Sequence, residues 1–169
     1  MKLKLGAVLT AVAAIAVTAG GLTTSTSFAA PLAAGAAAAG SSTLAPTSGT
    51  ETTTFNLTAP AGAACPGDSI AGYRLQTFIA SSNVDLAVLA YTASGPTSPG
   101  AGTFVAPLYS TTGTQQTNKT LAAGSGAFAG IVTYNFATNT SASLVNGKYN
   151  IGYACTLSGA TEKYWSTPI

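Results

Sequence analysis

The strongest constraint on the fold is a run of strict alternation near the C-terminal end of the chain. The run follows the dipeptide Asn146-Gly147, and its alternate positions carry the large side chains Tyr149, Ile151, Tyr153 and Cys155. Successive side chains of a β-strand point to opposite faces, so these four are expected to face a core, and Lys148, Asn150, Gly152 and Ala154 to face solvent or the thin side of the sheet. Asn and Gly both tolerate positive φ, so the dipeptide predicts a turn before this strand.

Similar short runs recur along the chain from residue 51 onward, separated by Gly, Pro, Asn and Ser. The predicted strands are 52–57, 73–79, 86–92, 103–109, 114–121, 130–136, 148–156 and 161–167. No window after residue 50 has a helical period. Seven or eight short strands within about 120 residues are typical of an antiparallel β-sandwich, which we assign to residues 51–169.

A resemblance to known sandwiches is carried by the segment Leu144-x-x-Gly147-x-Tyr149-x-Ile151-x-Tyr153-x-Cys155. It resembles the corner and penultimate strand of immunoglobulin-like and fibronectin type III-like domains, in which a Tyr hydroxyl bonds to upstream backbone. The resemblance implies an all-β, antiparallel immunoglobulin-like sandwich with Tyr149 and Gly147 at the structural corner, and Tyr153 is the competing corner residue. The chain departs from antibody domains because its only Trp, Trp165, lies on the last predicted strand.

A second resemblance covers about residues 65–166, through Gly72-Tyr73-Arg74 and the segment from Gly152 to Thr156. Here the chain is similar to uncharacterised secreted or cell-surface proteins of high-GC Gram-positive bacteria. This resemblance implies a secreted, extracellular protein, with association to the cell wall as one variant of that location.

The N-terminus has the layout of a secretory signal peptide. Lys2 and Lys4 precede an apolar run at 5–17, and Ser27 and Ala29 provide the small residues before a cut after Ala29. Residues 1–29 are therefore predicted to be removed, and no membrane segment is expected afterwards. Two alternatives remain open at this point: a cut within 33–39 and an uncleaved anchor.

Residues 30–50 are predicted to be a disordered, low-complexity linker. They consist almost entirely of Ala, Gly, Ser, Thr and Pro, with Leu32 and Leu44 as the bulky apolar side chains. Such a stretch buries too little surface to offset its ordering entropy.

Charge excludes one large class of partners. The chain has six basic and four acidic side chains, and two of the basic ones leave with the signal peptide. A near-neutral mature chain has no basic field to neutralise phosphates, so no nucleic-acid partner is expected.

The two cysteines, Cys65 and Cys155, are predicted to form one disulfide, as is usual for a pair in an exported protein. A redox-active pair would require CxxC spacing or a neighbour that stabilises a thiolate, and the sequence has neither.

Catalysis and metal binding lack their usual residues. Histidine is absent, which excludes Ser–His and Cys–His nucleophiles, and the four carboxylates are scattered outside any recognisable motif. We therefore expect no enzyme activity, no metal site and no cofactor.

Aromatic side chains are the remaining candidates for ligand binding, and they are Trp165, Tyr164, Tyr91 and Tyr109. Trp165 and Tyr164 are neighbours on one strand, so one should face the core and the other the surface. The leading hypothesis is a secreted or surface-exposed, non-catalytic module with a structural or adhesive role, whose partner is a cell-wall polysaccharide or another surface protein. The alternative is a carbohydrate- or small-ligand-binding module, since the composition is similar to that of secreted apo-chromoproteins of the neocarzinostatin type. The oligomeric state is left open.

The signal peptide gives the first testable prediction. Intact-mass measurement and N-terminal sequencing of protein from culture supernatant should find Ala30 as the first residue. Secreted protein that retains Met1, or an absence of secreted protein, would contradict it.

Overall fold

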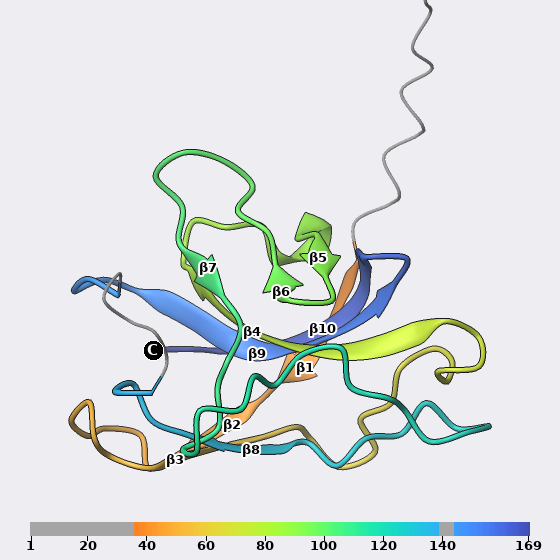
Figure 1. Ribbon diagram of the computed structural model, residues 1–169, viewed down its shortest axis with the longest axis horizontal. Coiled ribbons are helices and arrows are strands. Elements are labelled where there is room, and N and C mark those ends of the chain that lie inside the picture. The colour runs from red at the N-terminus through yellow and green to blue at the C-terminus, as the bar shows by residue number, and fades with distance from the viewer. Residues whose placement is uncertain (1–35, 139–143) are drawn as a thin grey trace, which may run out of the picture. The chain divides into compact units, whose positions relative to one another are not determined.

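The computed structural model describes residues 36–138 and 144–169, and the regular secondary structure within them is almost entirely β-strand (Figure 1). The elements are β1 (Ala37–Ser41), β2 (Thr43–Ala45), β3 (Phe55–Thr58), β4 (Tyr73–Ser81), the 3₁₀ turn η1 (Leu86–Val88), β5 (Tyr91–Thr92), β6 (Gly95–Pro96), β7 (Val105–Ala106), β8 (Ile131–Tyr134), β9 (Tyr149–Leu157) and β10 (Ala160–Pro168). The all-β prediction is confirmed. The predicted signal peptide lies outside the described residues.

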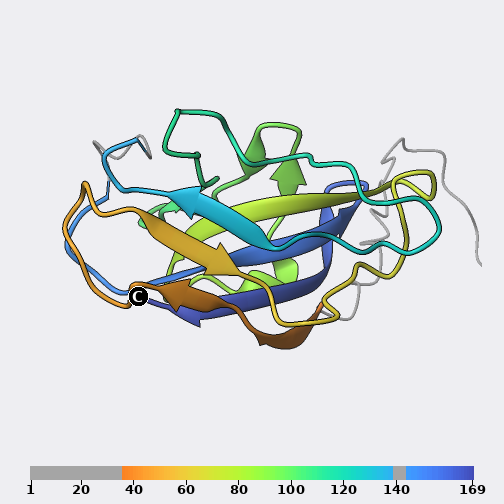
Figure 2. The ribbon, with the colours of Figure 1, turned by 90° about the horizontal axis from the view of Figure 1, so that it is seen from below.

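The strands form two facing sheets and one small hairpin. The larger sheet has the order β1-β10-β9-β4-β7, the smaller one β2-β3-β8, and β5 pairs with β6. Pairing is antiparallel throughout except between β1 and β10. In Figure 2, β3 and β8 lie across β9 and β4, as expected for two layers of a sandwich.

The main core fills the space between the two sheets. The larger sheet contributes Leu75, Ile79, Tyr149, Ile151, Tyr153, Cys155 and Trp165, and the smaller sheet contributes Phe55, Leu57, Val132 and Tyr134. The four alternating residues of the 148–156 run all point into this core, which confirms the orientation predicted from their spacing.

The opposite face of the larger sheet is also covered. Phe78 and Ala154 pack there beneath Leu86, Leu89 and Tyr91, which belong to η1, β5 and their junction. The expectation that alternate residues of β9 face solvent is therefore wrong for Gly152 and Ala154, because the chain between β4 and β7 folds back over them.

Part of the predicted linker is also ordered, which corrects the assignment of residues 30–50. Residues 37–41 run parallel to β10 and residues 43–45 pair with β3. These residues supply little apolar surface, but their backbone groups complete hydrogen bonds at two sheet edges, and Ala39 and Leu44 pack against the main core.

Three predicted strands are much shorter than expected, and one turn has a different conformation. The 86–92 segment begins as η1, with the Asp85 side chain accepting from the Ala87 amide, and only its end is a strand. The 103–109 segment keeps two strand residues, and the 114–121 segment makes only isolated bridges. The chain bends at Asn146-Gly147 without positive φ at either residue.

The predicted disulfide between Cys65 and Cys155 is present, with 5.4 Å between the two Cα atoms. It joins the loop after β3 to the C-terminal part of β9 across 90 residues of sequence. In the chain-entropy account a loop of this length stabilises the folded state by about 4–5 kcal/mol.

Gly152 allows β9 and β10 to approach closely, and its replacement is the second prediction. A Cβ at this position would clash with the Trp165 carbonyl oxygen and lie 2.9 Å from the Phe78 ring. Backbone cannot move aside as a flexible side chain can, so Gly152→Ala should lower the free energy of unfolding by about 3 kcal/mol, the upper end of the usual cost of overpacking. Urea unfolding followed by Trp165 fluorescence measures this loss. Gly100→Ala is the matched control, because nothing lies within 4 Å of its added Cβ; equal effects of the two changes would contradict the steric explanation.

Candidate functional site

The two candidate corner tyrosines make different contacts. The Tyr149 hydroxyl donates to the Val145 carbonyl oxygen at 2.7 Å, four residues upstream, which is the contact expected of the corner residue. The Tyr153 hydroxyl is buried and lies 2.5 Å from the carbonyl oxygens of both Leu57 and Gly130. Burial raises the pKa of Tyr153. Tyr149 therefore fixes the entry to β9, and Tyr153 connects the two sheets.

Two of the four aromatic candidates are core residues. Trp165 is 2% exposed and packs edge-on against Phe128, with 5.3 Å between ring centroids, while Lys163 Nζ lies 5.0 Å from the indole centroid. Tyr91 is buried in the second core, and burial raises the pKa of its hydroxyl. Neither ring offers an exposed binding surface, because each is buried in a core.

The other two candidates are half-buried. Tyr109 forms an isolated bridge with Gln115 in the loop after β7. Tyr164 is on β10 and faces the opposite side from Trp165, where it lies against the second core and lines a surface hollow. The structure does not bring the four candidates together: Tyr164 lines this hollow, whereas Tyr91 lines another one.

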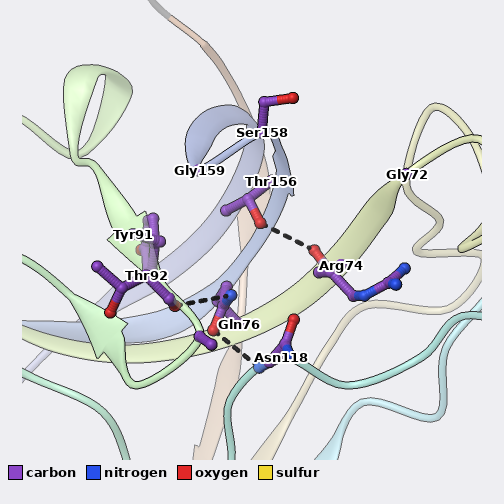
Figure 3. A pocket seen from close by; sticks show the side chains of 10 residues that line it. Gly72, Arg74, Gln76, Tyr91, Thr92, Asn118, Thr156, Ser158 and Gly159 are labelled. Atoms are coloured by element: carbon purple, nitrogen blue, oxygen red, sulfur yellow. Dashed lines mark hydrogen bonds between the residues drawn. The ribbon is translucent and has the colours of Figure 1, made fainter.

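One hollow, the Gln76 hollow, lies on the outer face of the larger sheet between the start of β4 and the β9–β10 turn (Figure 3). It has a volume of about 280 Å³, and its floor is formed by Arg74, Gln76 and Thr156. The Gln76 amide nitrogen donates to the Thr92 carbonyl at 3.5 Å, and its oxygen accepts from the Asn118 amide at 2.9 Å. Gln76 thus holds β5 and the 118 loop onto the sheet.

Two further polar side chains of the Gln76 hollow are also engaged. Arg74 donates to the carbonyl oxygens of Ser69 and Tyr73, at 3.1 and 2.8 Å, and in Figure 3 its side chain runs away from Gln76. The Thr156 hydroxyl donates to the Arg74 carbonyl at 3.4 Å. The Gln76 hollow therefore serves mainly to fasten loops to the sheet.

A larger hollow, the Tyr164 hollow, lies on the same face beside β1. Its volume is about 510 Å³, and its polar side chains are Ser41, Asp85, Asn150, Tyr164 and Ser166. Within the described residues, the side chains of Ser41, Asn150, Tyr164 and Ser166 make no hydrogen bond. One carboxylate oxygen of Asp85 accepts a hydrogen bond from the Ala87 amide at 3.0 Å. The other carboxylate oxygen accepts a hydrogen bond from no described residue.

An apolar groove, the end groove, lies where the β2–β3 loop meets the segment before β9. It has a volume of about 340 Å³, and its apolar lining consists of Leu44, Phe55, Phe136, Leu144, Val145, Tyr149 and Ile169. The rings of Phe55, Tyr134 and Phe136 form a cluster beneath it, with centroids 5.3 to 5.7 Å apart.

The described residues contain no group of three His, Cys, Asp or Glu side chains placed to hold a metal ion. No helix in this part of the chain is long and apolar enough to cross a membrane. In comparisons with known proteins, no family model, no curated protein and no solved structure matches the chain.

Several residues of the Tyr164 hollow were not singled out from the sequence. Alternation along β9 places Asn150 on the face opposite Ile151, so the face of the sheet that Asn150 occupies could be predicted from the sequence. Ser41 and Asp85 had no such signal, because one lies in the predicted linker and the other in a loop whose fold-back is not encoded by any periodic pattern.

Acid sensitivity of the loop next to the Gln76 hollow is the third prediction. The Asp68 carboxylate accepts from the amides of Gly124, Ala71 and Ile70, at 2.5, 3.0 and 3.0 Å, and these bonds, that of Gly124 foremost, lower the pKa of Asp68 below its usual 3.8. Because its pKa is lower in the folded state than in the unfolded state, the Asp68 carboxylate stabilises the fold at pH values above its unfolded-state pKa. This stabilisation is lost as the pH falls through the folded-state pKa.

Between about pH 5 and pH 2, the free energy of unfolding of Asp68→Asn should therefore fall less than that of the wild type, as measured by urea titration at each pH. Glu162→Gln, on an exposed part of β10, is the control and should retain the wild-type slope. Parallel pH profiles for wild type and Asp68→Asn would show that the three amide bonds do not contribute.

Proposed function

We propose that the chain is a secreted or surface-exposed, non-catalytic immunoglobulin-like module with an adhesive role, and that it binds saccharide through the Tyr164 hollow. In immunoglobulin-like sandwiches the third, sixth and seventh strands share one sheet, and the first, second and fifth share the other. Here β4, β9 and β10 share one sheet and β2, β3 and β8 the other. This order and the Tyr149–Val145 bond support the assignment.

The observation that carries the binding proposal is the composition of the Tyr164 hollow. A sugar ring presents an apolar C–H face and a rim of hydroxyl groups, so its binding site combines an aromatic ring with side chains that donate and accept hydrogen bonds. The hollow supplies the Tyr164 ring, the Asn150 amide, the free Asp85 oxygen and hydroxyls on β1 and β10. A cell-wall polysaccharide or a glycan on another surface protein has the matching chemistry.

The base of this site is rigid. Tyr164 and Asn150 stand on β10 and β9, and the next strand, β4, is buried on both faces over most of its length. The Cys65–Cys155 disulfide restrains β9 further. A site held in place before binding loses less conformational entropy when the ligand arrives.

A non-catalytic role is supported by the same lining. Glycoside hydrolysis usually requires two carboxyl groups on either side of the scissile bond, and among the described residues Asp85 is the one acidic side chain that lines the Tyr164 hollow. The arrangement favours binding without cleavage.

A second candidate function, binding of a small apolar ligand, is favoured by the end groove. Its lining brings two phenyl rings and four aliphatic side chains to one surface opening. Phe136→Ala should weaken the binding of an apolar fluorescent probe such as anilinonaphthalene sulfonate without changing saccharide binding, because the end groove and the Tyr164 hollow share no lining residue.

The fourth prediction tests the saccharide site. Secreted wild-type protein is screened against purified cell-wall polysaccharides, and the best ligand is titrated calorimetrically. Tyr164→Ala should weaken binding by at least about tenfold, which corresponds to loss of about 1.4 kcal/mol of ring contact.

Asn150→Ala is a second variant, because it leaves the ring in place and removes only the amide. Tyr109→Ala, a half-buried tyrosine away from the hollow, is the matched control and should bind as the wild type does. An absence of saturable binding, or equal weakening by Tyr109→Ala, would overturn the saccharide site.

A further inference from the structure

The smaller sheet ends in an unpaired strand edge at β8. Among residues 36–138 and 144–169, this strand pairs with β3 on one side and with no strand on the other. The Ala59 amide donates to the Gly130 carbonyl at 2.8 Å, so the hydrogen-bonded pairs along β3 and β8 fall at Gly130, Val132 and Tyr134. In an antiparallel ladder the intervening residues direct their backbone groups the other way, so Ile131 and Thr133 present N–H and C=O groups along the free edge.

No strand of the described part of the chain fills the space beside this edge. The segment that precedes β8 joins the larger sheet instead, where Lys119 and Leu75 exchange two backbone hydrogen bonds, at 2.9 and 3.0 Å. Between Lys119 and Ile131 lies a groove of about 290 Å³, with Val132, Phe128 and Tyr153 among its lining. Immunoglobulin-like sandwiches place a fourth strand at this position of the smaller sheet, next to the fifth.

The β8 edge also lacks the features that keep strand edges apart. Natural edges are protected by charged side chains, by Pro or by very short strands. Pro46 follows β2 directly, and β7 has two residues followed by Pro107. β8 reads Ile-Val-Thr-Tyr, without charge or Pro, and Ile131 is 65% exposed.

We propose that two copies of this chain pair through their β8 edges, antiparallel about a twofold axis, to form one six-stranded sheet from their two smaller sheets. An antiparallel edge is self-complementary under twofold symmetry, since each donor of one copy meets the same acceptor of the other. Residues 36–169 carry four basic and four acidic side chains, so no net charge opposes the approach of a second copy. Pairing uses the smaller sheet and is independent of the proposed saccharide site, which stands on the larger one.

Sedimentation equilibrium of the full secreted chain, from low to high micromolar concentration, tests the proposal. Wild type should show a concentration-dependent monomer–dimer equilibrium. Thr133→Pro removes the outward N–H while leaving the bonds to β3, and should be monomeric throughout the range. Thr133→Ala keeps the N–H and should dimerise as the wild type does, which separates the backbone bond from side-chain effects.

Two further measurements make the outcome decisive. Trp165 fluorescence and the urea midpoint of Thr133→Pro show whether the variant is folded, and Ile131→Lys provides a second monomeric variant that retains every backbone donor. The Thr133 amide should exchange with solvent more slowly in the wild-type dimer than in Ile131→Lys. A wild type that is monomeric at all concentrations, or a dimer that persists in both Thr133→Pro and Ile131→Lys, would overturn the proposal. Saccharide binding by either variant is measured separately, because it tests the proposed function and not the pairing.

Discussion

The pairing of β4 with β9 is the interaction on which the rest of the structure depends. Nine residue pairs, from Tyr73–Leu157 to Ser81–Tyr149, run in unbroken antiparallel register. Cys155 and Tyr153 project from this pair into the main core, where one forms the disulfide and the other contacts the smaller sheet. On the other face, Phe78 and Ala154 receive the fold-back that carries η1 and β5. Both candidate hollows of the outer face stand on strands aligned by this register.

Sequence alternation predicted β4, β9 and β10 because each buries one side against the main core. Alternation wrongly left the other face of these strands to solvent, and the reason is physical. Gln76, Gly152 and Thr156 are polar or small, which is typical of solvent-facing positions, but hydrogen bonds and close strand packing let them be buried beneath a covering loop. β1 was not predicted for a related reason. It is held by backbone hydrogen bonds to the edge strand β10, and such bonds cannot be inferred from amino-acid composition.

The candidate site was predictable only in part. Adjacency of Tyr164 and Trp165 on one strand required opposite orientations, and the structure assigns Trp165 to the core and Tyr164 to the outer face. The companions of Tyr164 come from positions 41, 85 and 150, which lie between 14 and 123 residues away in sequence. Their meeting depends on the parallel β1–β10 pair and on the fold-back over β4, and neither leaves a periodic trace. Likewise, the vacancy beside β8 arises because the 119 segment pairs with β4 in the other sheet.

The two proposals reinforce one another through valency. An open hollow with one aromatic ring and a few hydrogen-bonding side chains binds a single saccharide unit weakly, because much of the ligand stays in water. A polysaccharide repeats its unit, so two linked hollows bind the second unit at the high effective concentration set by the first, and avidity exceeds either affinity. Pairing along β8 leaves both Tyr164 hollows on the outer faces of the larger sheets, away from the joined edge. An adhesive role on a repetitive surface then requires neither a deep pocket nor charge, which agrees with a chain that has few charged residues and shallow hollows.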